Sequence, residues 1–239
     1  MSASETPTQT VTLCLYRFGP WTERAWAFAQ MGLARLAMRR LPGQTFWKLM
    51  GSGVGEGFTP VPNTAVYGVL TVWTDAEAAR AGLDAPVFRR FARHARESCL
   101  LTLQPLTARG RWSGVSPFRA LSATPRGGPL AALTRGSVRP RDLRAFWRRV
   151  PGISRLIGDN PDVRLKIGMG EVPFLHQVTF SIWPDAESMA RFARTSGPHA
   201  AAIRAVREGD WFAEELYARF QVSGAAGVWQ GRPVTEVLA

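Results

Sequence analysis

Residues 162–220 read DVRLKIGMGEVPFLHQVTFSIWPDAESMARFARTSGPHAAAIRAVREGDWFAEELYARF, and the elements predicted within them decide the fold. The run 175–183 is rich in Val, Thr, Phe, Ile and Trp, a composition that predicts a β-strand. Its alternate residues Val178, Phe180 and Ile182 share one face. Asp185 follows at a position where it can cap a helix. The stretch is therefore predicted to run from a strand into helical segments that pack on one face of a sheet.

A second helical segment, opening at Gly197-Pro198, places a histidine on its apolar stripe. His199, Ile203 and Val206 recur at i, i+4 and i+7, the spacing of one helix face. We expect the His199 imidazole to point to the interior between helix and sheet. A histidine in such a place is more often a hydrogen-bonded core residue than a metal ligand, and both interpretations stay open.

The amino-acid composition limits the classes of partner that the protein is expected to bind. The chain has 239 residues, 46% of them hydrophobic, and a net charge of +12 that comes almost entirely from arginine. Such a charge attracts nucleic acid, a lipid surface or an acidic protein, or else reflects solvated helix faces. No zinc-finger, RRM or KH signature accompanies the arginines, so nucleic acid is not expected as a partner.

The termini and the cysteines point to the cytoplasm. The N-terminus MSASETPTQT lacks the pattern of a secretory signal. No apolar run approaches the roughly 20 residues that span a bilayer. Cys14 and Cys99 are the only cysteines, too few for a disulfide framework. We expect a cytoplasmic protein, soluble or peripherally associated with a membrane.

The sequence repeats itself. Lys48 and Lys166 are its only lysines, and each lies in a short strand-like run before a glycine-rich turn that carries one acid, Glu56 or Glu171. Each turn leads to a strand that ends in Trp-x-Asp-Ala-Glu, at 73–77 and 183–187. Self-similarity of this kind indicates a duplicated structural unit.

Both copies are predicted to follow the order β-α-β-β-α-β, the ferredoxin-like unit. In the first copy the predicted elements are strand 11–18, helix 21–40, strand 45–50, strand 64–73, helix 75–97 and strand 100–105. The antiparallel sheet of such a unit carries helices on one face only, so its other face must be covered. We therefore predict an α+β fold in which tandem ferredoxin-like repeats form a dimeric-α+β-barrel-type fold within one chain.

The predicted domain boundaries follow from the repeat. Residues 1–106 form the N-terminal repeat, 107–128 a Gly-, Pro- and Arg-rich linker, 129–223 the C-terminal repeat and 224–239 a loosely structured tail. Trp112 and Phe118 in the linker are expected to be exposed, where they would suit an anionic membrane leaflet.

Few motifs carry chemistry. No Ser-His-Asp or Cys-His pattern is present. The loop GSGVGEG enters a strand and not a helix, so it lacks the helix N-terminus that holds a nucleotide phosphate. Glu56 and Glu171 are therefore expected to have structural roles in their turns.

The two copies differ at their histidines. Aligning Pro86 with Pro198 puts Val87 opposite His199. His176 likewise has an aliphatic counterpart in the N-terminal copy. Haem iron is commonly held by one histidine that a neighbour orients. We predict His199 as an axial metal ligand in the C-terminal repeat, with His176 as the alternative.

Four blocks give the chain a recognisable identity: FWKLMGSGVGEGFTPVPNTAVYGVLTVW, RGRWSGVSPF, KIGMGEVPFLHQVTFSIWPD and GPHAAAIRAVREGDWFAEELYARF. They resemble the spheroidene monooxygenases, the acyclic-carotenoid ketolases of phototrophic bacteria. The resemblance implies a haem-containing oxygenase that takes electrons from reduced ferredoxin. It would hydroxylate C-2 of spheroidene twice, and the gem-diol would dehydrate to spheroidenone.

The implied reaction needs a cofactor, because protein side chains do not provide activated oxygen. Only Cys14 or Cys99 could supply a thiolate ligand, and both are interpreted as buried apolar residues. Lys166 or Arg204 could pair with haem propionates, and the alternative for Lys166 is a solvated side chain. Two alternatives stay open: a cofactor-free ferredoxin-like monooxygenase and a non-enzymatic haem- or lipid-binding protein.

Overall fold

The computed structural model of the chain describes residues 8–55, 59, 61–120, 127–148, 160–194 and 211–238. The predicted ligand His199, the predicted propionate partner Arg204 and the turn residue Glu56 lie outside these ranges.

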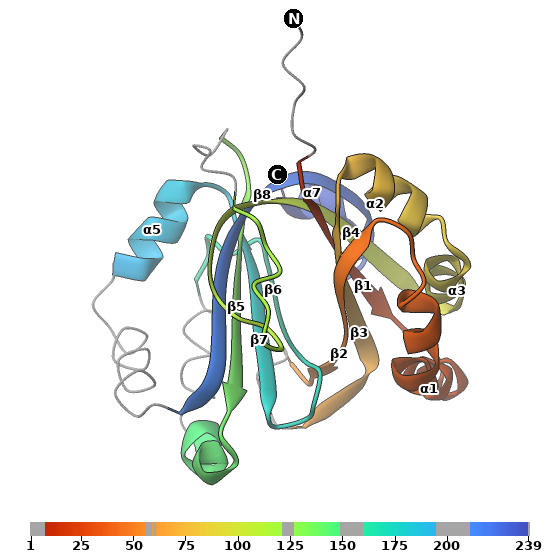
Figure 1. Ribbon diagram of the computed structural model, residues 1–239, viewed down its shortest axis with the longest axis horizontal. Helices are drawn as coiled ribbons and strands as arrows, with labels where there is room; N and C mark the ends of the chain where they lie inside the picture. Colours follow the sequence, from red (N-terminus) through yellow and green to blue (C-terminus); the bar gives the residue numbers. More distant parts are fainter. Residues whose placement is uncertain are drawn as a thin grey trace, which may run out of the picture.

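The described part of the chain is built on a closed antiparallel barrel (Figure 1). Its strand order is β4-β1-β3-β2-β6-β7-β5-β8, and a pairing between β4 and β8 closes the ring. The ring is paired most weakly between β2 and β6, where only Gly51 with Gly170 and Ser52 with Met169 are in register. The α+β class and the barrel are as predicted. The strands are β1 (Thr10–Arg17), β2 (Gln44–Gly53), β3 (Pro62–Trp73), β4 (Glu97–Gly110), β5 (Leu130–Val138), β6 (Leu165–Gly170), β7 (His176–Trp183) and β8 (Phe212–Trp229).

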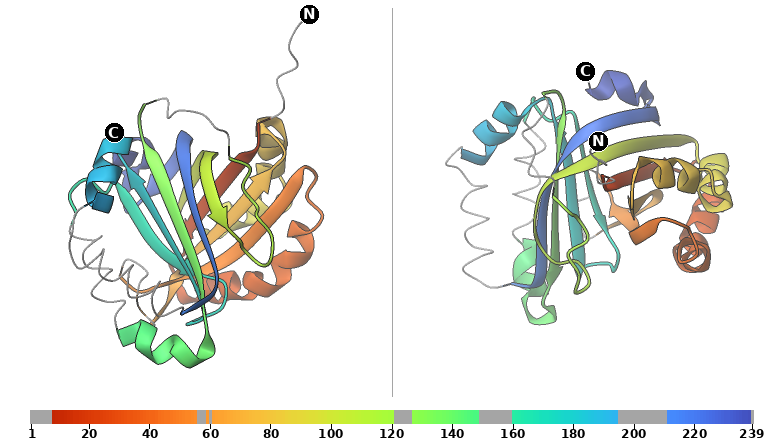
Figure 2. Two further views of the ribbon diagram at one scale, coloured as in Figure 1. Left: turned by 60° about the vertical axis from the view of Figure 1, so that its left-hand side comes forward. Right: turned by 45° about the horizontal axis from the view of Figure 1, so that its top comes forward.

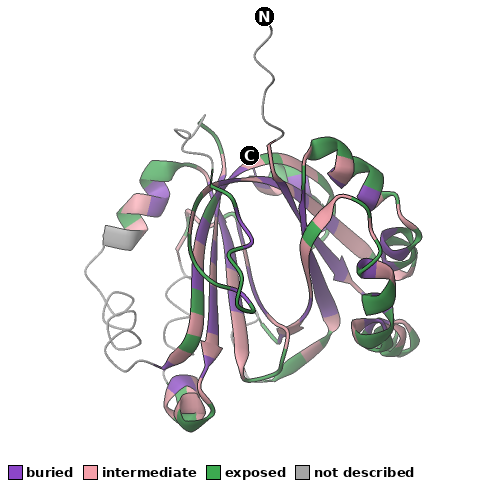
Figure 3. Ribbon diagram, viewed as in Figure 1, coloured by how far each residue is buried: buried purple, intermediate pink, exposed green. Residues whose placement is uncertain are grey.

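Apolar side chains from every strand fill the barrel interior. On β7 these are Val178, Phe180 and Ile182, each buried, as the strand alternation predicted. Leu13 and Leu15 of β1 face them in the same core. Figure 3 shows the strands as the most buried part of the molecule. Apolar side chains therefore form a common core inside the barrel.

Three helices cover the outer face of β1–β4, and another element lies on the opposite side of the barrel (Figures 1 and 2). The three are α1 (Trp21–Met38), α2 (Ala76–Leu83) and α3 (Pro86–His94). The single helix predicted over 75–97 is wrong. Proline disfavours helical geometry in the residue before it and donates no N–H, so Ala85 is extended at φ −62° and ψ 150° and the chain restarts as α3 at Pro86.

The outer face of the C-terminal strands carries α5 (Ala186–Arg194) and the helical residues 143–148. Asp185 accepts a hydrogen bond from Ser188 N (2.7 Å), and Asp75 accepts one from Ala78 N (2.8 Å) at the start of α2. These N–H donors lower the pKa of both carboxyl groups. Both Trp-x-Asp-Ala-Glu corners thus end a strand and begin a helix, as predicted.

The described residues of the predicted linker are ordered. Residues 107–110 continue β4, and beyond them Trp112 is fully buried, so the prediction that it is exposed is wrong. Phe118 is also buried and packs edge-on against Phe220, with ring centroids 5.0 Å apart. The prediction of exposure fails because both rings enter the barrel core.

The tail after Ser223 is ordered as well, against the prediction. β8 runs on to Trp229, followed by β9 (Arg232–Pro233) and α7 (Val234–Leu238). Trp229, Val234 and Leu238 join the barrel core. The tail therefore completes the core at that end of the barrel.

Candidate functional site

Glu171 ties three segments together at the turn between β6 and β7. Its Oε1 accepts a hydrogen bond from Trp112 Nε1 and its Oε2 accepts one from Lys48 Nζ, both at 2.6 Å. Lys48 also donates to Ser113 Oγ at 2.6 Å. Hydrogen bonds with an ionised partner are the strong ones, and both charged side chains are largely shielded from water. Glu171 therefore has the structural role that was expected for it, with Trp112 and Lys48 as its hydrogen-bond donors.

An arginine on the inner face of β5 holds the same segment from the other side. Arg135 is buried, forms an ion pair with Glu214 and lies 6.0 Å from the centre of the Trp112 ring. Glu214 also accepts hydrogen bonds from Ser113 N (2.8 Å) and Gly114 N (2.6 Å). Burial raises the pKa of Glu214, but these two N–H groups and Arg135 together lower it below its ordinary value.

His176 begins β7 beside these charges. Its Nδ1 is buried without a hydrogen bond to any described residue and lies 3.7 Å from Glu171 Oε1. Burial lowers the pKa of His176, Arg135 and Lys48 lower it further, and Glu171 and Glu214 act in the opposite direction. The ring is therefore a neutral imidazole at neutral pH, able to ligate a metal or to exchange a proton. We call Lys48, Trp112, Arg135, Glu171, His176 and Glu214 the inner polar cluster.

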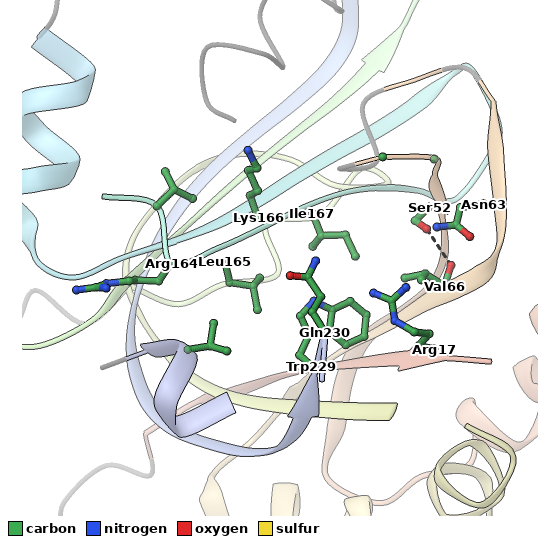
Figure 4. A pocket seen from close by; sticks show the side chains of 14 residues that line it. Arg17, Ser52, Asn63, Val66, Arg164, Leu165, Lys166, Ile167, Trp229 and Gln230 are labelled. Carbon is green, nitrogen blue, oxygen red and sulfur yellow. Dashed lines mark hydrogen bonds between the residues drawn. The ribbon is translucent and has the colours of Figure 1, made fainter. Parts of the chain in front are cut away.

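Lys166 lies on the other side of the sheet. Leu165 and Ile167 point into the barrel core, so the residue between them points outward, as Figure 4 shows. Its Nζ is buried. Lys48 and Lys166 occupy β2 and β6 but face opposite ways, so their one-to-one match in the sequence is wrong. Lys166 and His176 are likewise on opposite faces and cannot flank the same flat group.

Small residues form the middle of the outer face of the C-terminal strands. In the strand register Gly168 pairs with Thr179, which pairs with Thr134, and Lys166 pairs with Ser181, which pairs with Ala132. We call these six residues the outer floor.

Two apolar clusters stand at opposite ends of this floor. One comprises Val138, Phe146 and Trp211, and the other Leu130, Trp183 and Met189. A floor of small residues between apolar walls, with a lysine on it, fits a flat apolar group with acidic substituents, the character of haem. The chemistry of these residues is compatible with the cofactor that the resemblance implied. The predicted partners His199 and Arg204 lie outside the described residues and stay predictions.

Neither cysteine is suited to be a thiolate ligand. Cys14 lies under the N-terminal helices and Cys99 inside the barrel. Burial raises the pKa of each thiol to about 12, so both are neutral at physiological pH. They are buried apolar residues, as predicted. Within the described ranges no group of three or more His, Cys, Asp or Glu could hold a metal ion.

A cavity of about 290 Å³ opens where β6 begins (Figure 4). Val66, Leu165 and Ile167 form apolar walls, while Arg17 and Arg164 bring positive charge. Arg17 is held by Glu97 at 2.9 Å and lies 4.9 Å from the centre of the Trp229 ring. The volume is at the small end for ligand pockets.

The inner polar cluster was mostly missed from the sequence. One signal was available for Arg135, because alternation from Ala131 and Leu133 places it on the inner face of β5. A charge at an interior position predicts a buried ion pair. Its partner Glu214 could not be told from Glu215, since both adjoin the start of a strand.

Comparison with known proteins gives consistent results. No protein-family model matches the chain. It is 50% identical over 233 residues to a spheroidene monooxygenase of Cereibacter sphaeroides, covering 96% of this chain and 72% of that protein. It is 46% identical over 224 residues to one of Rhodobacter capsulatus (92% and 93% covered) and 36% identical over 210 residues to one of Rubrivivax gelatinosus (87% and 80%).

Solved structures share the fold. A crystal structure of aldoxime dehydratase superposes with a TM-score of 0.61 at 12% identity, covering 93% of this chain and 84% of that one. An aldoxime dehydratase in complex with butyraldoxime gives 0.60 at 10% identity, covering 92% and 81%. At such identities the likeness shows the fold alone.

Proposed function

Because the chain belongs to the spheroidene monooxygenase family, we propose that it is a haem-dependent monooxygenase of spheroidene-type acyclic carotenoids. It hydroxylates C-2 twice and gives the 2-ketone, with electrons from reduced ferredoxin. The observation that carries the proposal is 50% identity to a spheroidene monooxygenase over 96% of the chain.

The outer floor is the proposed haem site. Haem bound there supplies the activated oxygen that side chains cannot provide. His199 is the proposed ligand, and Lys166 and Arg204 the proposed partners of the propionates. The small residues of the floor and the outward direction of Lys166 support this placement.

Two observations favour His199 over the other candidate ligands. To ligate iron as a thiolate, Cys14 or Cys99 would have to lose its thiol proton, although burial raises the pKa of each thiol to about 12. His176 is within 3.7 Å of Glu171 and faces a packed barrel interior. Its proposed part is to stay neutral and position the turn between β6 and β7.

The carotenoid is placed outside the barrel in this proposal. Core side chains pack inside the barrel, and the 290 Å³ cavity that core residues line is at the lower limit even for drug-sized ligands. We place the polyene beside the outer floor, near the two apolar clusters that contain Trp183 and Phe146. These clusters exclude water from the carbon to be oxidised.

Positive charge suits the proposed electron donor. Ferredoxins are acidic, and the net charge of +12 would steer such a partner to the surface. The enzyme would work in the cytoplasm, peripherally attached to the membrane that holds its substrate. None of the helices in the described part of the chain is long and apolar enough to cross a membrane.

A tandem repeat is the proposed origin of the barrel. The N-terminal strands lie in the order β4-β1-β3-β2, and the C-terminal strands in the corresponding order β8-β5-β7-β6. The capped corners at Asp75 and Asp185 supply a second correspondence. Both observations support duplication of one ferredoxin-like unit.

One spectrum tests the function. Purified protein should show a Soret band that shifts after dithionite and carbon monoxide, and it should convert spheroidene with reduced ferredoxin. Lack of any Soret band after haem reconstitution favours the cofactor-free monooxygenase. A Soret band without turnover favours a haem- or lipid-binding protein.

A further inference from the structure

Helix α1 presents large apolar side chains to solvent on the side away from the barrel. Trp21 is 78% exposed, Phe28 71%, Leu33 67% and Leu36 65%. Monomeric proteins rarely leave such a group of apolar residues together on the surface without a partner. Figure 3 shows the outward side of this helix as exposed and its inward side as buried.

These residues form one continuous stripe. Trp21, Phe28 and Leu36 are separated by seven and eight residues, two helical turns each, and Leu33 flanks them. Only small residues, Ala25, Ala29 and Gly32, lie between them, and all three are exposed. The opposite stripe, with Ala27, Ala34 and Met38, packs on the barrel. We call the exposed side the α1 stripe.

Arginines border the stripe. Arg24 and Arg35 lie on the same helix and are exposed, and Arg39 and Arg40 follow its end. Arg24 and Arg35 donate only to the backbone oxygens of Gly19 and Met31, and neither has an ion pair within the described residues.

Neighbouring groups leave this positive charge uncompensated. The one acidic residue of the helix, Glu23, is bonded to His94 of α3 at 2.6 Å. The exposed Arg89, Arg90 and Arg93 of α3 add further charge on the same side of the barrel.

We propose that the α1 stripe docks the protein on an anionic lipid bilayer. A helix with Trp, Phe and Leu on one side and arginines beside them has the character of an interfacial helix, and each arginine near an anionic leaflet adds to binding. The inference rests on the proposed function in one respect: a polyene substrate dissolves in the membrane, so docking brings the enzyme to it.

Other occupants match the stripe less well. In a twofold contact with a second copy, Arg24 and Arg35 would face arginines of the partner, and like charges placed together oppose association. An acidic protein would match the arginines but leave four large apolar residues without a counterpart. A bilayer satisfies both.

Sedimentation of the full chain with vesicles tests the proposal. Vesicles of phosphatidylcholine mixed equally with phosphatidylglycerol should bind the protein, and pure phosphatidylcholine should bind it weakly. The double variant Trp21→Ser/Phe28→Ser should bind the mixed vesicles at least about tenfold more weakly. The matched control Val61→Ser/Val228→Ser, which removes exposed apolar side chains elsewhere, should bind as the unchanged protein does.

A second pair of variants tests the charge. Arg24→Gln/Arg35→Gln should weaken binding to the mixed vesicles about fivefold per arginine, whereas Arg109→Gln/Arg232→Gln should have a smaller effect. Circular dichroism checks that all variants are folded. Equal binding by the stripe variant and its control overturns the proposal.

Light scattering tests whether the α1 stripe contacts a second copy of the chain instead of a bilayer. A protein that is a dimer and becomes a monomer in Trp21→Ser/Phe28→Ser assigns the stripe to a second copy and also overturns the proposal. Vesicle binding needs neither haem nor turnover. Vesicle binding without turnover would refute the proposed function and support the docking surface. Turnover without vesicle binding would support the proposed function and refute the docking surface.

Discussion

The two outer faces of the barrel differ in the size of their side chains. On the N-terminal side, outward positions of β1, β2 and β3 carry Tyr16, Leu49, Tyr67 and Val69, all buried under α1–α3. On the C-terminal side, outward positions of β5, β6 and β7 carry Thr134, Gly168, Thr179 and Ser181. The same strand order thus supports a filled face and a face floored by small residues.

The contrast teaches where a ligand can fit. Close packing of aromatic rings, such as Tyr16 on Phe91 with centroids 5.2 Å apart, makes the N-terminal face a core and nothing more. In the middle of the C-terminal face the strands carry small side chains, and apolar clusters lie at both ends. A proposed binding site is therefore expected on one half of the barrel only.

A large side chain in the middle of the outer floor should have the largest effect on haem binding. Gly168→Leu would give β6 the side chain that Leu49 gives β2, and overfilling a fitted contact costs about 1–3 kcal/mol. We expect up to about 100-fold weaker haem binding by titration of the apoprotein. Gly51→Leu on β2, where an added Cβ meets nothing within 4 Å, is the matched control and should bind haem normally. Equal haem binding by both variants would contradict the site.

Substitutions of the two lysines should have different effects, because Lys166 points to the outer face of the sheet and Lys48 to the inner face. Lys166→Met should weaken haem binding about tenfold, because a charge-assisted contact is worth about 1.5–3 kcal/mol. Lys48→Met should leave haem binding intact and lower the free energy of unfolding by a similar amount, because Glu171 loses its 2.6 Å partner. Urea unfolding and haem titration measure both, and exchanged phenotypes would refute the assignment of faces.

Acid should act on the inner polar cluster. The pKa of His176 is lowered in the folded chain, so below about pH 6.5 the unfolded state binds more protons and stability falls. The lowered pKa of Glu214 adds a second loss as pH falls through about 4.3. Urea midpoints between pH 8 and 5 should fall less steeply for His176→Gln than for the unchanged protein. Parallel slopes would show that His176 does not contribute.

The helix caps should give the smallest effects. Asp75→Ala and Asp185→Ala each remove one side-chain acceptor at the start of α2 or α5, and both should lower the melting temperature slightly and to a similar extent. Only Asp185→Ala should also loosen haem, because α5 packs at one wall of the outer floor through Met189. Haem loss from Asp75→Ala would erase the distinction between the two halves.

Alternation and capping made part of the fold predictable. Val178, Phe180 and Ile182 were correctly placed together on one face of β7, which is the inner face, and the strand–helix corners were also predicted correctly. The tail was not predictable, because Gly224, Ala225, Ala226 and Gly227 have no strand propensity of their own. They become a strand only by pairing with residues 99–102 of β4. At Gly227, φ is +93° and a Cβ would lie 2.1 Å from Ser98 O, so glycine is required.

The candidate site was predictable only where one residue carries the signal. His176 could be found from its aliphatic counterpart Val66, which also faces inward. The burial of Trp112 could not, because the segment around it is rich in Gly, Pro and Arg, and its partners Lys48 and Glu171 are far away in sequence. Long-range closure of the barrel places them together.

The haem content of His199→Ala, measured beside that of His176→Ala, shows which histidine holds the iron. His199→Ala should purify with little haem, and free imidazole should partly restore its Soret band. His176→Ala should keep its haem and lose only turnover rate. Full haem and an unchanged spectrum in His199→Ala, with loss of haem in His176→Ala, would contradict the account and move the iron to the inner polar cluster.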